Sequence, residues 1–398
     1  MEKVAIVSCY FQQNYGSMLQ AFATQYIVEK LGYESETICI DGFAEEIRNI
    51  KIRYYFSRIF DVQIFKSKIG SIKRAFQMAT NSDFRKKSYR REQKFQEFKT
   101  KEFKLSPSYH SKQELSQACK YYKAVIVGSD QLWLPSNIAA DYYTLNFVPE
   151  NINKIAYATS FGVTHLPKKQ WGIAKTFLNR IQHLSVREVN GQKIVSEITG
   201  RRARIVCDPT LLLDVEEWSK NFPQKKIEKE KYIFCYFLGS NPIHRKFART
   251  LKKYTGYQII ALLHLDEYIA EDNVFPDKAL YDVGPADFLN LIRGAEYVLT
   301  DSFHGTIFSI IYEKRFFTFK RFSENSSVST NSRIDTLVMQ FQLQERLEPQ
   351  CENIKTYINM PIDYQLVKEK VLDMKKISQE FLECALRGED SDKGRRKI

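Results

Sequence analysis

The chain has 398 residues, of which 43% are apolar and 14% aromatic, and its formal net charge is +13. This length favours two domains over a single core, and the apolar content excludes a wholly disordered chain. No apolar run approaches the roughly 18 residues of a membrane span, and no signal-like segment precedes the first strand, so we expect a cytoplasmic protein. The seven cysteines are widely spaced and contain no Cys-x-x-Cys pair, which predicts reduced thiols and no zinc framework.

The positive charge is concentrated in one segment. Residues 48–104 contain 17 Lys and Arg but 5 Asp and Glu, whereas the rest of the chain is nearly neutral. Apolar residues recur there at spacings of three and four, which predicts basic amphipathic helices within an insertion at residues 45–118. The insertion either packs on the first domain with a solvated charged face, or contacts an anionic membrane surface through residues 48–104. No recognised nucleic-acid-binding module is visible, so nucleic acid is the least favoured partner.

The first residues predict the opening of a parallel α/β sheet. A buried strand over residues 4–9 is followed by a polar loop, a helix over residues 18–31 and a strand over residues 36–40. The loop has a glycine at its helix entry but no G-x-G-x-x-G pattern, so the dinucleotide fingerprint is absent. Residues 14–16 are therefore either a tight turn or a ligand-facing loop whose glycine permits close backbone approach.

Four further apolar runs end in small polar or charged residues. They cover residues 124–127, 155–158, 183–186 and 204–207. Because the carboxyl ends of parallel strands meet at one edge of a sheet, four such exits predict a lined crevice. The residues at these exits are Ser129, Asp130, Ser160, Arg187, Glu188 and Asp208.

A second α/β set follows a polar, lysine-rich stretch at residues 216–230, which we interpret as a linker. Its most informative strand, residues 297–299, runs into Thr-Asp-Ser-Phe-His-Gly and then into an apolar helix. This junction places a carboxylate, a hydroxyl and an imidazole at a sheet edge. It also directs the N–H groups of a helix start toward whatever binds there.

These residue types suit a small anionic substrate and a proton transfer. Arg187 and Arg333 can each hold a carboxylate or phosphate bidentately, and His304 can exchange a proton near neutral pH. The alternatives are a structural histidine at 304, an ordinary salt bridge at Arg187 and a turn-forming Asp208 before proline. No pair of histidines has metal-ligand spacing and no nucleophile elbow occurs, so we expect no metal site.

Five short motifs occur in order, and together they resemble the polysaccharide pyruvyl transferase family over about residues 1–345. The basic insertion is not part of the matching pattern, and the loop at residue 128 reads Gly-Ser-Asp without a strongly glycine-rich form. The motifs are NYGSMLQA at residues 14–21, GSDQLW at 128–133, SVRE at 185–188, DPT at 208–210 and DSFHG at 301–305.

The resemblance implies an α/β fold of two Rossmann-like domains that face each other across a cleft, similar to the GT-B glycosyltransferases. The basic helical insertion would belong to the first domain. The expected organisation is an N-terminal domain at residues 1–215, a linker at 216–230, a C-terminal domain at 231–350, a helical segment at 351–386 and a charged tail at 387–398.

The resemblance also implies a function in surface polysaccharide biosynthesis. Pyruvate would pass from phosphoenolpyruvate to hydroxyls of a glycan or lipid-linked saccharide as a cyclic ketal, with no cofactor. By motif position, His304 would be the acid–base residue, Arg187 would hold the donor, and Ser302 and Gly305 would lie against the phosphate. The reaction also needs a base, for which Asp130 and Asp208 are the candidates. The other candidate substrate-binding residues, taken from the predicted loops, strand ends and helix starts, are Asn14, Tyr15, Gly16, Ser129, Ser160, Thr306 and Arg333.

Two other functions fit the same sequence. A nucleotide-sugar glycosyltransferase of the GT-B form would also present donor phosphates to a helix start. A non-catalytic scaffold of a polysaccharide assembly complex would need neither His304 nor Arg187 for its role. In the pyruvyl transferase interpretation, the basic insertion would hold the protein at the cytoplasmic face of the membrane.

Overall fold

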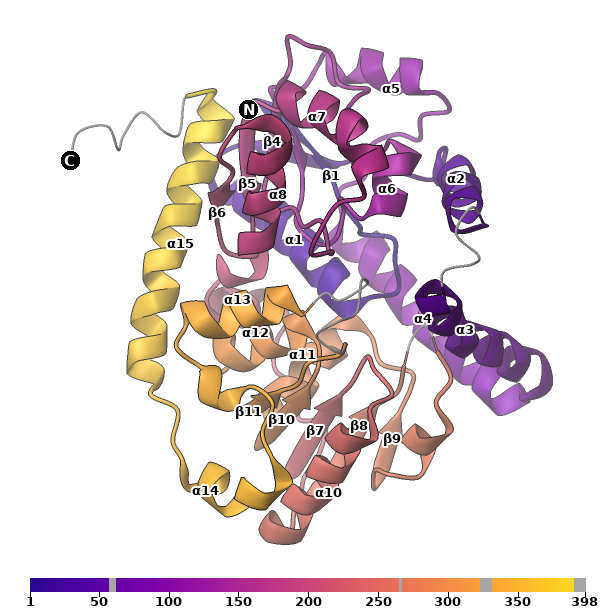
Figure 1. Cartoon of the computed structure of the whole chain (residues 1–398), viewed down its shortest axis with the longest axis vertical. Helices are drawn as coiled ribbons and strands as arrows, with labels where there is room; N and C mark the ends of the chain where they lie inside the picture. Colours follow the sequence, from indigo (N-terminus) through magenta and orange to yellow (C-terminus); the bar gives the residue numbers. More distant parts are fainter. Residues whose placement is uncertain (57–61, 265–266, 323–330, 390–398) are drawn as a thin grey trace.

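A computed structural model describes residues 1–56, 62–264, 267–322 and 331–389 of the chain (Figure 1). Part of the basic segment, residues 57–61, and most of the expected tail, residues 390–398, lie outside this described part. Two fully parallel sheets with flanking helices confirm the expected α/β class. All seven cysteines are unpaired, and five of them are buried. None of the described helices is long and apolar enough to cross a membrane.

The N-terminal domain is built on a six-stranded sheet with the order β2-β1-β3-β4-β5-β6. Its central strands are short apolar runs with helices on both faces, and residues 4–7 and 124–127 are completely buried. Near-continuous apolar strands of this kind are typical of parallel sheets covered on both faces. The strands are β1 (Lys3–Val7), β2 (Glu34–Thr37), β3 (Ala124–Val127), β4 (Asn153–Ala156), β5 (His183–Val186) and β6 (Arg204–Ile205).

The C-terminal domain is built on a five-stranded sheet with the order β11-β10-β7-β8-β9. Its two central strands, β7 and β10, pair in parallel from Tyr297 opposite Ile233 to Thr300 opposite Tyr236. Both strands therefore end at the same edge of the sheet. The strands are β7 (Tyr232–Tyr236), β8 (Gln258–Leu262), β9 (Lys278–Leu280), β10 (Tyr297–Thr300) and β11 (Arg315–Thr318).

Helices cover both sheets (Figure 1). The α-helices of the N-terminal domain outside the insertion are α1 (Tyr15–Lys30), α6 (Pro135–Ala140), α7 (Trp171–Arg180) and α8 (Val189–Thr199). The α-helices that come after the N-terminal sheet in the chain are α9 (Val215–Asn221), α10 (Pro242–Thr255), α11 (Pro285–Gly294), α12 (Phe303–Ile311), α13 (Ser332–Gln340), α14 (Ile354–Asn359) and α15 (Tyr364–Arg387).

The expected linker at residues 216–230 begins as the helix α9. Asp214 caps this helix in a reciprocal pair with Glu217, and Trp218 is completely buried between the domains. A capping box followed by a buried aromatic residue stabilises this helix. The charged composition of the segment alone did not predict it. The linker proper is the shorter stretch between α9 and β7.

The last helix, α15, returns from the C-terminal domain to pack along the N-terminal domain (Figure 1). The Asn153 amide donates to the Ala385 carbonyl at 2.7 Å, and the Cys207 N–H donates to Ser378 Oγ at 2.9 Å. The chain therefore crosses between the domains twice, which limits how far they can separate.

The basic insertion forms α2 (Ala44–Phe56), α3 (Val62–Thr80), α4 (Ser82–Glu102) and α5 (Lys112–Cys119). One of the two expectations was that the insertion packs on the first domain. The structure differs from this expectation, because α4 contacts both domains. On the N-terminal side, Phe95 packs against Tyr15 and Phe98 against Phe22. On the C-terminal side, Lys94 pairs with Asp287 at 2.9 Å.

Arg91 of α4 is the strongest of these connections. Its side chain is buried, and its guanidinium donates to the carbonyls of Leu263 and His264 at 3.0 Å and to that of Tyr281. The same group lies 3.5 Å from the centre of the Tyr281 ring. An arginine of the insertion thus satisfies three backbone carbonyls at the edge of the second sheet.

We expect Arg91→Ala to lower the free energy of unfolding by about 2–4 kcal/mol, because three buried carbonyls lose a charged donor. Arg90→Ala, one residue earlier on the exposed face of α4, is the matched control and should stay within about 0.5 kcal/mol of the parent. Urea unfolding followed by tryptophan fluorescence measures both. Equal midpoints for the two variants would contradict the bridging role of Arg91.

Candidate active site

A cavity of about 270 Å³ lies where the carboxyl edges of the two sheets face each other. Its size is near the lower end of the about 300–1,000 Å³ range of small-molecule sites. The N-terminal domain contributes loops after β1 and β3 and the helix α2, and the C-terminal domain contributes segments after β7, β10 and β11. The polar and charged residues that line it are Gln12, Asn14, Ser17, Lys51, Tyr55, Asp130, Gln131, Ser136, Asn137, Asp301, Ser302, His304, Arg321, Asn331 and Arg333.

His304 stands at the start of α12 and reaches across the domain boundary. Its Nε2 lies 3.5 Å from Oδ2 of Asp208, which follows β6 of the other domain. The opposite side of the ring lies against Gly16 of α1, where an added Cβ would be 2.0 Å from Nδ1 of His304. The glycine therefore leaves the space that the imidazole occupies, and the Asp208 carboxylate lies beside the ring.

The start of α12 is held by its own side chains. Ser302 is the N-cap and accepts from the Gly305 N–H at 3.3 Å. A Cβ on Gly305 would meet Thr300 Oγ1 at 2.5 Å, so this glycine allows the helix to pack on its strand. Thr306 is completely buried, where its hydroxyl donates to the Ser302 carbonyl at 3.0 Å. Ser302 faces the cavity, whereas Gly305 and Thr306 lie behind it.

Arg187 is the centre of a buried ionic network. Its guanidinium contacts Asp208 at 2.8 Å, Asp130 at 3.2 Å and Glu188 at 3.8 Å, and it lies 4.4 Å from the Phe303 ring centre. Only 1% of the side chain is exposed, and it is not among the lining residues. Arg187 therefore orders the carboxylates behind the cavity.

This network sets the ionisation of its acids. Burial alone would raise the pKa of Asp208, but His304 and Arg187 lower it below the usual range. Burial also opposes ionisation of Asp130, and Arg187 with His304 again lowers its pKa. Glu188 behaves oppositely, because burial outweighs Arg187 and raises its pKa. Two of the three carboxylates are thus held ionised beside the imidazole.

Asp130 is the carboxylate of this network that reaches the cavity. Its side chain is 15% exposed, and it accepts from the Ser17 hydroxyl and from the Gln131 N–H. Its φ of +83° lies in the left-handed region, which few residues other than glycine adopt. Strained backbone of this kind is concentrated at ligand-binding positions.

Three cationic side chains line the cavity around these acids. Arg333 of α13 is half-buried, and desolvation together with the charge of Arg187 lowers its pKa to about 10. Burial also lowers the pKa of Lys51 on α2, and within the described part of the chain this lysine makes no hydrogen bond or ion pair. Arg321 follows β11 on the opposite wall. An anion bound between them would relieve the cost of partly burying Arg333 and Lys51.

The structure brings some of the predicted residues to the cavity and leaves others outside it. Asn14 lines the cavity while its side chain accepts from the Ser17 N–H at 3.0 Å. Tyr15 is completely buried, stacked on Phe288 in the interface between the domains. Ser129 donates to Asp208 at 2.7 Å and Ser160 to Glu188 at 2.7 Å, both behind the cavity.

Several lining residues were not predicted. Lys51 and Tyr55 lie within the basic insertion, where many lysines and aromatics share the same spacing and none is distinguished by its neighbours. Asp301 was visible in its motif, but its role is structural, since it accepts from the Gly239 N–H at 2.9 Å. Arg321 follows a strand, so the rule that exits of parallel strands meet at one edge could have identified it.

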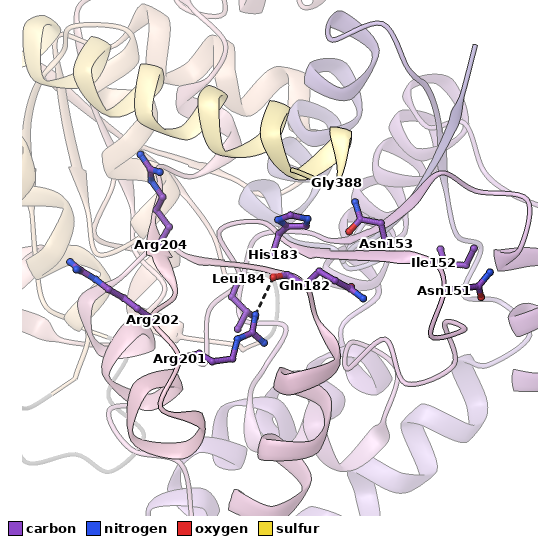
Figure 2. A pocket seen from close by; sticks show the side chains of 10 residues that line it. All are labelled: Asn151, Ile152, Asn153, Gln182, His183, Leu184, Arg201, Arg202, Arg204 and Gly388. Atoms are coloured by element: carbon purple, nitrogen blue, oxygen red, sulfur yellow. Dashed lines mark hydrogen bonds between the residues drawn. The ribbon is translucent and has the colours of Figure 1, made fainter. Parts of the chain in front are cut away.

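A second, larger cavity of about 630 Å³ lies at the amino ends of β4, β5 and β6 (Figure 2). Its basic side chains do not converge. Arg201 donates to the carbonyls of Leu178 and Gln182, and Figure 2 shows Arg202 and Arg204 extending away from His183. We therefore assign the functional site to the interdomain cavity, where acid, base and cations face one space.

The interdomain cavity can perform proton transfer on a small anion. It combines an oriented imidazole, an ionised carboxylate and three cations. Among the described residues, no group of three or more His, Cys, Asp or Glu is arranged to hold a metal ion.

Comparison with known proteins agrees with this geometry. The model of the polysaccharide pyruvyl transferase family matches residues 14–321. No curated protein matches the chain in sequence. The matched region contains all five motifs and most of the interdomain cavity, which also includes Cys9 and Gln12 before it and residues 331–334 after it.

Solved structures share the two-domain fold at low sequence identity. A UDP-N-acetylglucosamine 2-epimerase is 10% identical with a TM-score of 0.51, over 100% of this chain and 97% of that one. Staphylococcus aureus MnaA, solved with UDP, is 10% identical with a TM-score of 0.50, over 97% of each chain. Acinetobacter baumannii MurG is 7% identical with a TM-score of 0.43, over 98% of this chain and 100% of that one. The first two structures confirm the expected GT-B-like fold, and their likeness concerns the fold alone.

We expect Gly16→Ala to displace the His304 ring from Asp208, because no methyl group fits at 2.0 Å from the imidazole. Gly172→Ala is the matched control, since Gly172 is also the second residue of a helix and nothing lies within 4 Å of its added Cβ. Crystal structures of the two variants and their thermal melting measure the effect. An unmoved His304 in Gly16→Ala would contradict the steric assignment.

The lowered pKa of Asp208 predicts how stability depends on pH. The ionised carboxylate stabilises the fold above the unfolded pKa of about 3.9, and this contribution is lost as the pH falls through the folded pKa. Asp208→Asn should therefore cost about 3–5 kcal/mol near neutral pH, and the difference from the parent should shrink below about pH 4. Urea unfolding across this range tests it, with the exposed Asp83→Asn as control. A constant difference would contradict the assignment.

Proposed function

The chain belongs to the polysaccharide pyruvyl transferase family, and on that basis we propose that it transfers pyruvate from phosphoenolpyruvate to two hydroxyls of a glycan sugar. The product would be a cyclic pyruvate ketal, and inorganic phosphate would be released. The observation that carries the proposal is a single interdomain cavity in which an imidazole, a carboxylate and three cations meet. Because phosphoenolpyruvate is a cytoplasmic metabolite, we place the reaction in the cytoplasm.

The donor carries a phosphate and a carboxylate, so its site needs more than one cation. We assign Arg333, Arg321 and Lys51 to these two groups, since they are the cationic side chains that line the cavity. The N-terminal turn of α12, capped by Ser302, faces the same space and supplies backbone donors for the phosphate. Arg187 positions Asp130 and Asp208 from behind, because it is buried among carboxylates.

The chemistry starts with protonation of C3 of the enol, which leaves a positively charged C2. We assign this proton to His304, whose Nε2 lies 3.5 Å from Oδ2 of Asp208. One acceptor hydroxyl then adds to C2 and loses its proton to Asp130, the ionised carboxylate at the cavity wall. Phosphate leaves, and the second hydroxyl closes the ketal. The proton balance closes, because the two acceptor hydroxyls lose two protons in total, C3 gains one proton and the released phosphate carries the other.

Phosphate release from phosphoenolpyruvate, measured against a panel of glycan and lipid-linked acceptors, tests the proposal. We expect acceptor-dependent release that falls about 10²–10⁴-fold in His304→Gln, because a general acid is lost. His165→Gln, at an exposed loop position, is the matched control and should keep the parental rate.

A thermal-shift series separates the proposal from its alternatives. Stabilisation by phosphoenolpyruvate and not by nucleotide sugars supports it. Stabilisation by a nucleotide sugar alone would instead favour a glycosyltransferase of the same fold. If neither ligand binds and His304→Gln leaves the cellular phenotype intact, the chain acts as a scaffold.

A further inference from the structure

The helices α2 and α3 carry large apolar side chains on their outer surfaces. Ile52 and Phe56 of α2 are 44% and 67% exposed, and Ile72 and Phe76 of α3 are 63% and 64% exposed. Ile72 and Phe76 are four residues apart and therefore share one face of their helix. Single exposed apolar residues are ordinary, but four on two successive helices mark an interaction surface.

Exposed basic side chains occur on the same helical insertion. Lys73 lies beside Ile72 on α3, and Lys86 and Arg90 lie on the exposed side of the adjoining α4. None of the three forms an ion pair within the part of the chain that the structure describes. Other basic residues of the insertion are occupied, such as Arg91 and Lys94 at the C-terminal domain. The charge that remains outside is therefore available to an anionic partner.

We propose that this docking face, made of Ile52, Phe56, Ile72, Lys73 and Phe76 with Lys86 and Arg90 beside it, binds the surface of an anionic phospholipid bilayer. Apolar side chains that project among lysines and arginines enter the boundary between headgroups and acyl chains, while the cations contact anionic headgroups. Charge alone would suit nucleic acid equally, but exposed aliphatic and aromatic tips favour a partner with an apolar interior.

The position of the docking face connects it to the cavity. On α2, Lys51 and Tyr55 line the interdomain cavity, whereas their neighbours Ile52 and Phe56 face solvent. In Figure 1 the helices α2 and α3 lie along the same side of the molecule, beside the region between the domains. Docking would therefore bring the cavity close to the bilayer. The consequence that a lipid-linked saccharide is the acceptor rests on the proposed function.

Co-sedimentation of the full chain with vesicles tests the docking face. One set of vesicles contains phosphatidylcholine and phosphatidylglycerol in equal parts, and the other contains phosphatidylcholine alone. We expect binding to the anionic vesicles at about 0.1 M salt, and weaker binding at about 1 M salt, where the Debye length falls from about 10 Å to about 3 Å. No binding to anionic vesicles, or equal binding to both sets, would overturn the proposal.

Ile72→Glu/Phe76→Glu should weaken binding to the anionic vesicles by at least about tenfold, because it removes two inserting side chains and adds two negative charges. Ile243→Glu/Leu372→Glu is the matched control, with the same charge change at positions 59% and 63% exposed on α10 and α15. Equal loss in both variants, or no loss in the first, would overturn the assignment of the face. Phosphate release with a soluble acceptor should be the same in both, so failure of the proposed reaction would leave this test unaffected.

Discussion

The contact between His304 and Asp208 is the constraint on which the site depends. The imidazole belongs to one domain and the carboxylate to the other, and Nε2 and Oδ2 are 3.5 Å apart. The ring fits only because position 16 has no Cβ. The contact exists only when the domains hold their observed distance, so the relative placement of the domains is itself part of the site.

The domains are held in this position by elements outside the two sheets. Arg91 and Lys94 of α4 bind the C-terminal domain through hydrogen bonds and an ion pair, while Phe95 and Phe98 of the same helix pack on the N-terminal domain. The helix α15 adds a second connection between the domains, because it returns from the C-terminal domain to the N-terminal domain. A side chain that is buried and donates to three carbonyls cannot move without losing all three bonds. The basic insertion is therefore a structural part of the cleft and more than a charged attachment.

The sequence was sufficient to predict the α/β fold, and several of the candidate site residues line the interdomain cavity. Short apolar runs that end in polar residues predicted parallel strands, and the junction before α12 correctly indicated the edge where His304 lies. The role of each residue within the site was harder to predict from the sequence. Arg187 and Asp208 follow strands just as Asp130 does, yet only Asp130 reaches the cavity, because that depends on packing between segments far apart in sequence. Lys51 could not be distinguished, because spacing of three and four identifies a helix face but not what it contacts.

The distribution of charge in the insertion follows from the same packing. Along the sequence the 17 basic residues at 48–104 look equivalent, but helices distribute them over different faces. Some are matched, as the buried Arg91 is by carbonyls and the exposed Lys104 is by Glu29 at 2.8 Å. Lys51 faces the cavity, and Lys73 faces solvent beside exposed apolar groups. A single helical segment thus joins the two domains, supplies a cation to the cavity and leaves a basic, apolar surface outside, so changes in the insertion should affect stability, catalysis and surface binding separately.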